Sequence, residues 1–132
     1  MQCDMQTLIT NDIKVSVEVF YRPVESRPDA ERFVFSYRIT IENLGSDTVQ
    51  LLRRRWYITD SVGDPREVEG LGVVGQTPIL RPGASHSYGS WCPLTSSIGK
   101  MSGYFTMINI RTRQNFAVQV PEFKMIADFK LN

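Results

Sequence analysis

Apolar and polar residues alternate with a period of two along much of this chain. The clearest alternation lies in residues 33–42, where the odd positions are large and apolar and the even positions are mostly polar. A similar alternation runs from Ile13 to Tyr21. Because successive side chains of a strand point to opposite faces, this period indicates half-buried β-strands. The odd positions expected in the core are Ile13, Val15, Val17, Val19, Tyr21, Phe33, Phe35, Tyr37, Ile39 and Ile41.

Shorter strand-like segments follow, separated by turn residues such as Gly45 and the run Val62–Pro65. No window shows a convincing helical period. Many short alternating segments with glycine and proline between them predict one all-β domain, a single antiparallel β-sandwich over residues 13–132. Residues 1–12 show no clear period and are predicted to be a lead-in. The later predicted segments are Val49–Thr59, Arg66–Val74, Ser85–Cys92, Gly103–Ile110, Phe116–Val120 and Phe123–Leu131.

The stretch from Arg53 to Pro78 concentrates unusual residues: three consecutive arginines, Trp56 and a Gly-x-Gly-x-x-Gly motif. Alternation places Arg54 on the apolar face of its strand, with Leu52, Trp56 and Ile58, and places Arg53 and Arg55 on the other face with Tyr57. An arginine on an apolar face needs a partner. Asp60 and Glu67 are the candidate partners for a structural ion pair. Trp56 is expected in the core.

The motif Gly70, Gly72, Gly75 matches the dinucleotide-binding fingerprint as text. That fingerprint works only between a strand and a helix, and Pro78 and Pro82 follow too soon for such a helix;. Two interpretations stay open. The glycines could present backbone N–H groups to an anion, with Arg54 as a phosphate-binding side chain. Alternatively they permit a bulge or a close approach of strands, which is the interpretation we favour.

Composition narrows the function classes. The chain has 132 residues, a net charge of +1 and two cysteines. This charge indicates no nucleic-acid or anionic-membrane partner, and no apolar run is long enough to cross a membrane. Cys3 and Cys92 form no disulfide framework, and no signal peptide is apparent, so we expect a cytoplasmic location with reduced thiols;.

No residue set forms a convincing catalytic or metal site. His86 is the only histidine, and no serine lies in a Gly-x-Ser-x-Gly motif;. One histidine and two distant cysteines match no familiar zinc spacing, and Asp60, Asp64 and Glu67 do not have the spacing of a calcium loop;. We therefore expect neither an enzyme nor a bound cofactor or metal. Trp91, at a strand end, is the better candidate for an exposed aromatic anchor.

Several segments resemble the ApaG family in order and spacing, from about Ile13 to the end of the chain. They are Tyr37–Asn43, Arg54–Asp60, Val68–Gly75, Met101–Tyr104 and Val120–Phe123. The resemblance implies a fibronectin-III-like, immunoglobulin-like β-sandwich. It also implies a link to cobalt resistance and magnesium efflux, and a gene neighbouring a dinucleoside-polyphosphate hydrolase. Related domains in F-box proteins and in a DNA-polymerase-interacting protein look like interaction modules.

The chain departs from the family pattern in places. Arg55 replaces a histidine that usually precedes the tryptophan, Trp91 replaces a small residue, and Thr95-Ser96-Ser97 replaces a Thr-Pro segment. The first change removes any role of that histidine here. The second alters one loop surface.

The leading hypothesis is a non-catalytic binding module with a protein partner. Arg53, Arg55 and Trp91 are the partner-contact candidates. The alternative is binding of a pyrophosphate-containing nucleotide, or another anion, at Gly70–Gly75 with Arg54. The sequence leaves the strand order and the oligomeric state open.

Overall fold

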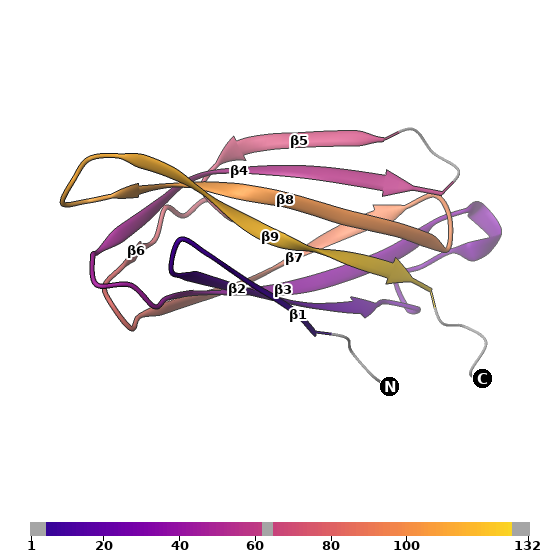
Figure 1. The fold of residues 1–132 in the computed structure, drawn as a ribbon. Coiled ribbons are helices and arrows are strands. Elements are labelled where there is room, and N and C mark those ends of the chain that lie inside the picture. The colour runs from indigo at the N-terminus through magenta and orange to yellow at the C-terminus, as the bar shows by residue number, and fades with distance from the viewer. Residues whose placement is uncertain (1–4, 62–64, 128–132) are drawn as a thin grey trace.

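The computed structural model describes residues 5–61 and 65–127, which form two antiparallel sheets packed face to face (Figure 1). Within these residues one sheet has the order β1-β2-β3-β7 and the other the order β5-β4-β8-β9, with β6 also pairing with β4. This confirms the predicted antiparallel β-sandwich. The strands are β1 (Met5–Thr10), β2 (Ile13–Tyr21), β3 (Phe33–Asn43), β4 (Val49–Asp60), β5 (Arg66–Leu71), β6 (Ile79–Leu80), β7 (Ser85–Leu94), β8 (Ile98–Asn109) and β9 (Asn115–Ile126).

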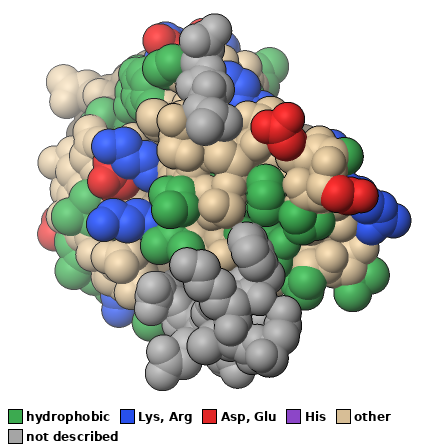
Figure 2. Space-filling model, turned by 90° about the vertical axis from the view of Figure 1, so that its right-hand side faces the viewer, with side chains coloured by type: hydrophobic (Ala, Val, Ile, Leu, Met, Phe, Trp, Pro, Cys, Tyr) green, Lys and Arg blue, Asp and Glu red, His purple; other side chains and the backbone are tan. Residues whose placement is uncertain are grey.

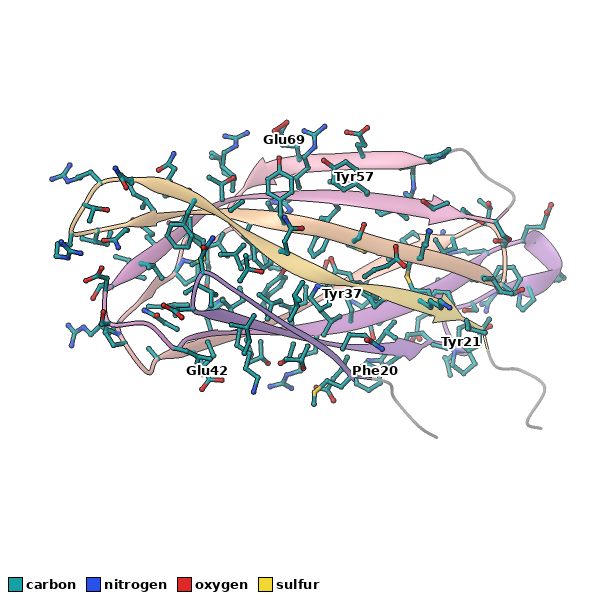
Figure 3. The ribbon with its side chains drawn as sticks, in the orientation of Figure 1. Phe20, Tyr21, Tyr37, Glu42, Tyr57 and Glu69 are labelled. Carbon is teal, nitrogen blue, oxygen red and sulfur yellow. The ribbon has the colours of Figure 1, made fainter. Side chains whose placement is uncertain are left out.

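The core lies between the sheets and consists of the inward faces of alternating strands. Trp56 is 3% exposed and packs edge-to-face against Tyr37 and Phe105, with ring centroids 5.9 Å apart in each pair. Tyr37 points into the space between the layers, whereas Phe20 projects from the outer face of the lower sheet (Figure 3). The fully buried side chains include Ile13, Val15, Val17, Phe35, Ile39, Ile41, Leu51, Phe105, Met107 and Met125.

Two strand predictions need correction near proline residues. β8 begins at Ile98, before the predicted segment Gly103–Ile110. β9 is one strand that continues through Pro121 to Ile126, where two separate segments, Phe116–Val120 and Phe123–Leu131, were predicted. β9 is an edge strand, and its register against β8 shifts opposite residues 101–103. A proline is tolerated at such an edge irregularity because it has no N–H to pair.

Residues 5–10, predicted as part of the lead-in, form the edge strand β1. This strand pairs with β2 along its whole length, from Met5 opposite Glu18 to Thr10 opposite Ile13. Nearly all its side chains are exposed, so the hydrophobic alternation that marks a half-buried strand is absent from it;. The predicted turn at Val62–Pro65 falls largely on residues 62–64, outside the described residues.

A β-bulge at Leu52 changes the phase of β4. Before it, Val49 and Leu51 face the core, and after it Trp56 and Ile58 do. Leu52 itself, predicted on the apolar face, is only half-buried because the extra residue takes it out of alternation;. The placement of Arg54 on the inward side therefore holds.

The described residues contain one short 3-10 helix, Pro28–Ala30, in the loop between β2 and β3. No helix in this part of the chain is long and apolar enough to span a membrane. The end of the sandwich nearest this loop carries hydrophobic patches between scattered charges of both signs (Figure 2).

Candidate functional site

The glycine-rich turn after β5 is built around Gly72. Gly72 is buried, has φ of +62°, and a Cβ there would lie 2.2 Å from the carbonyl oxygen of Gln76. The Gly72 N–H donates to the Leu52 carbonyl at 2.8 Å, the Val73 N–H to Gln76 at 2.8 Å and the Gln76 N–H to Val73 at 3.0 Å. Only glycine fits that conformation and that approach without strain. Gly75 also has a positive φ, +75°, but nothing lies within 4 Å of its Cβ position.

Arg54 lies against this turn. It stands opposite Gly70 across the β4–β5 pair, and its Nη1 donates to the carbonyls of Leu71 at 3.1 Å and Gly72 at 3.0 Å. A Cβ on Gly70 would approach Nη1 to 2.9 Å, so the missing side chain leaves room for the guanidinium. The structure thus brings Arg54 together with Gly70 and Gly72 of the predicted anion site, whereas no contact joins Arg54 to Gly75.

The partners of Arg54 differ from the predicted carboxylates. Asp60 accepts hydrogen bonds from Thr95 and Ser96, and Glu67 forms an ion pair with Arg55. Arg54 instead donates hydrogen bonds to the main-chain carbonyls of Leu71 and Gly72 at the end of β5. Because these contacts engage Nη1 of Arg54 and three N–H groups of the turn, they favour the structural interpretation of the glycine motif over an anion-binding nest.

Arg53 and Arg55 lie on the outer face of the same sheet, as alternation predicts. Arg55 pairs with Glu67, and with Glu69 at 3.4 Å, while Arg53 approaches Glu69 at 3.9 Å. Figure 3 shows Glu69 projecting from this outer surface. The two carboxylates neutralise the arginine charges locally, and such solvent-exposed pairs contribute little to stability.

An open groove of about 740 Å³ lies on the outer face of the other sheet, across β2, β3 and β7. The strand register explains it. Arg38 in β3 has Glu18 on one side and Gly89 on the other, and Ser36 lies between Phe20 and Trp91. Because Ser36 is small and Gly89 has no side chain, a hollow remains between their larger neighbours.

Arg22 is held between two aromatic rings at one end of the groove. Its guanidinium carbon lies 5.6 Å from the centroid of Phe20 and 5.3 Å from that of Trp91, and its Nε donates to Ser36 Oγ at 2.7 Å. These are cation–π distances. Trp91 is 54% exposed, which confirms the predicted exposed position of this aromatic residue.

Arg38 lies in the same groove and is exposed. Among the described residues its side chain makes no hydrogen bond or ion pair. The sequence interpretation missed Phe20, Arg22 and Arg38 as site residues because they occupy even positions on strands assigned to a solvated face. The available signal was Phe20, a large aromatic on that otherwise polar face.

The candidate catalytic and metal-binding groups are dispersed. His86 stacks on Tyr88 with ring centroids 6.3 Å apart, and within the described part of the chain no hydrogen bond joins it to a serine or a carboxylate. No three His, Cys, Asp or Glu side chains of residues 5–61 and 65–127 come together as a potential metal site. Burial raises the pKa of the Cys92 thiol, so the thiol form is favoured;.

Comparison with known proteins identifies the family. The ApaG domain model matches residues 23–109. ApaG proteins of Brucella suis biovar 1 and Bdellovibrio bacteriovorus are 47% and 44% identical over 121 and 128 residues; the first match covers 92% of each chain, the second 97% of this chain and all of the relative. The crystal structure of a Bordetella pertussis protein described as ApaA is 39% identical with a TM-score of 0.86, covering 90% of this chain and 96% of that one. These similarities place the chain in the ApaG family.

Proposed function

We propose that this protein is a non-catalytic module that binds a protein partner through the groove on β2, β3 and β7. The observation that carries the proposal is the Phe20–Arg22–Trp91 stack beside Arg38, whose guanidinium has no partner among the described residues. Aromatic and arginine side chains dominate the binding energy of protein interfaces. Here both kinds are exposed together, and neighbouring strands hold them in place.

The charges of the groove define the partner. Among the described residues that line the groove, two are arginines, Arg22 and Arg38, and one is a carboxylate, Glu18. The outer face of the other sheet, by contrast, pairs its arginines with Glu67 and Glu69. We therefore assign to the groove a protein segment that carries carboxylates, since complementary charge directs association and rejects wrong partners.

A role in cobalt or magnesium homeostasis, as the family resemblance suggests, would in this proposal run through the protein partner. The described residues offer no cluster of three metal-ligating side chains that would support direct metal binding. The pyrophosphate alternative has less support, because Arg54 and the N–H groups of Gly72 and Val73 already donate to carbonyls.

The test is affinity capture from the native cell extract with the full chain and matched variants. Trp91→Ala removes the exposed ring, and Arg38→Glu reverses the charge of the groove arginine. Ile79→Ala is the control, because Ile79 is 60% exposed but lies on β6 in the other sheet. We expect at least one protein that is retained by the wild type and the control and lost from both groove variants. Thermal melts confirm that each variant is folded.

Charge exchange then identifies the contact. A carboxylate of the captured partner changed to lysine should restore binding to Arg38→Glu. Two results contradict the proposal. In one, no protein is enriched over a charge-matched unrelated protein. In the other, the enriched protein binds Trp91→Ala and Arg38→Glu as well as it binds the wild type.

A further inference from the structure

The strand beside the groove, β7, is an open sheet edge. It runs over Ser85–Leu94 and, within residues 5–61 and 65–127, pairs with β3 alone. Edge strands expose unpaired main-chain groups that can pair with another chain, so proteins usually protect them by charge, proline, bulges or a covering segment. β7 has a proline only at position 93 and no charged side chain from residue 85 to residue 92.

The other edges of the sandwich are protected. β1 and β9 meet along one side, where Asn11 Nδ2 donates to the Ala117 carbonyl at 3.0 Å and the Gln119 N–H approaches Thr10 Oγ1 at 3.4 Å. β5 is only six residues long and carries three charged residues, Arg66, Glu67 and Glu69. Among the described strands, β7 is therefore the long edge that lacks protection.

The hydrogen-bond pattern shows which main-chain groups of β7 are free. On the side of β3 that faces β7, the Asn43 N–H donates to the Ala84 carbonyl at 3.0 Å. On the side of β3 that faces β2, the Val34 carbonyl accepts a hydrogen bond from the Arg22 N–H. In an antiparallel pair these directions alternate residue by residue. Even-numbered residues of β7 thus bond to β3, and odd-numbered ones turn their N–H and C=O groups outward. The outward residues are Ser85, Ser87, Gly89 and Trp91.

This assignment of outward main-chain groups to the odd-numbered residues of β7 agrees with two further observations. Pro93 has an odd number, so its missing N–H falls on the outward edge, where proline is tolerated. The Pro93 carbonyl accepts a hydrogen bond from Arg66 Nη2 at 3.0 Å, which closes that end of the edge against β5. The open part is therefore Ser85–Trp91, directly beside the groove.

We infer that the partner binds by strand addition: an extended acidic segment of another protein pairs with β7 and places a carboxylate over Gly89 onto Arg38. This inference rests on the proposed function and specifies its mode. Strands lie about 4.8 Å apart, so an added strand runs roughly 10 Å from β3. Because Gly89 is the cross-strand neighbour of Arg38 and has no side chain, an acidic side chain and the arginine can meet above it.

Strand addition combines two sources of recognition. Main-chain hydrogen bonds to the outward groups of β7 give affinity, and alternate side chains of the added strand reach the groove and give specificity. Carboxylates at alternate positions would face Arg38 and Arg22. A second copy of this chain is the less favourable occupant, because pairing β7 with β7 brings the same arginines to both sides of the junction.

The first experiment uses a defined probe, the end-blocked heptapeptide Thr-Val-Glu-Val-Glu-Val-Thr, with the lysine peptide Thr-Val-Lys-Val-Lys-Val-Thr as its control. Amide chemical shifts of the full chain are followed to millimolar peptide. We expect shifts at the outward amides of Ser85, Ser87, Gly89 and Trp91 with the glutamate peptide only. Arg38→Gln should remove the preference for glutamate over lysine.

Main-chain pairing is tested separately from the groove. Ser87→Pro removes one outward N–H, while Ser87→Ala removes only the hydroxyl that contacts Thr40 at 2.9 Å. Loss of a hydrogen bond predicts about tenfold weaker binding for the proline variant and little change for alanine. Should the proline variant fail to fold, two N-methylated forms of the glutamate peptide give the same information, one methylated on the backbone nitrogens of its odd positions and the other on those of its even positions. One form should bind and the other should not.

The outcomes separate the two proposals. If the natural partner is lost from Trp91→Ala but retained by Ser87→Pro, and both methylated probes bind alike, strand addition is wrong and the groove remains the binding site. No binding of either peptide at millimolar concentration, together with unchanged partner capture by Ser87→Pro, also overturns strand addition. Concentration-dependent dimerisation that Ser87→Pro abolishes would assign the edge to a second copy instead.

Discussion

Two glycines of one turn offer a controlled test of why the Gly-x-Gly-x-x-Gly motif is there. Gly72 and Gly75 both have a positive φ, +62° and +75°. They differ in their surroundings: a Cβ at Gly72 would lie 2.2 Å from the Gln76 carbonyl oxygen, and a Cβ at Gly75 would meet nothing within 4 Å. Comparing Gly72→Ala with Gly75→Ala therefore separates backbone strain from steric exclusion.

Backbone strain is common to both variants. A non-glycine residue held at such a φ costs about 1 kcal/mol. Gly72→Ala must also displace Gln76, whose carbonyl accepts the Val73 N–H and whose own N–H bonds Val73. Weakening these two hydrogen bonds beside the buried Val73 adds about 1–3 kcal/mol to the loss of unfolding free energy. We expect a loss of unfolding free energy of about 1 kcal/mol for Gly75→Ala and about 2–4 kcal/mol for Gly72→Ala.

Thermal and urea unfolding measure this difference. For a domain of this size 1 kcal/mol corresponds to about 4 °C in Tm, so the expected losses are about 4 °C for Gly75→Ala and about 8–16 °C for Gly72→Ala. Equal losses in the two variants would refute the steric argument. The structural interpretation also expects no rise in Tm with millimolar pyrophosphate, because a ligand that binds the folded state must stabilise it.

Arg54, Cys92 and Asp47 offer three further tests. Arg54→Ala should lower the unfolding free energy by about 1–3 kcal/mol through the carbonyls it leaves unpaired, with Arg54→Lys recovering part of that loss in urea unfolding. Burial raises the pKa of Cys92, so in a Cys3→Ser background this thiol should react with iodoacetamide at neutral pH only after denaturation;. The hydrogen bond from Arg111 lowers the pKa of Asp47 from 3.8 to about 2; the extra stability of wild type over Asp47→Asn should therefore be full above pH 3.8 and disappear as pH falls to about 2;.

The alternating strands were predictable from sequence, because burial on one face imposes a period of two. β2 and β3 start where the alternation starts, and Trp56 lies in the core as expected. β1 was not predictable in this way. Its stability comes from pairing with β2 and contact with β9, and neither leaves a hydrophobic period in the sequence of an exposed strand.

The bulge at Leu52 shows a second limit of sequence reasoning. Alternation assumes an unbroken ladder, and one inserted residue shifts every earlier position to the opposite face. The glycines nearby indicated special geometry but did not reveal where the ladder shifts. The partner of Arg54 was equally hidden, since main-chain carbonyls are present at every residue and leave no compositional trace.

The groove could not be predicted from the sequence for a different reason. An outward side chain is free of packing constraints, so periodicity assigns it to solvent whatever its function. Nor does the strand period show that β7 lies beside β3, which is what places Trp91 over Ser36 and Gly89 beside Arg38. In the sequence, the signals for this surface were two aromatic residues: Trp91 at a strand end and Phe20 on an otherwise polar face.

Burial energetics give a physical reason to regard that exposed tryptophan as a binding residue. Trp91 is 54% exposed. A tryptophan carries up to about 250 Å² of surface, so roughly 130 Å² remains in water. At about 25 cal/mol per Å², a partner that covers the ring gains roughly 3 kcal/mol, which is more than a hundredfold in affinity. The ring contributes this energy without further ordering, because Arg22 already packs against it and is itself fixed by Ser36. A pre-ordered anchor loses little side-chain entropy on binding, so most of that gain can appear as affinity.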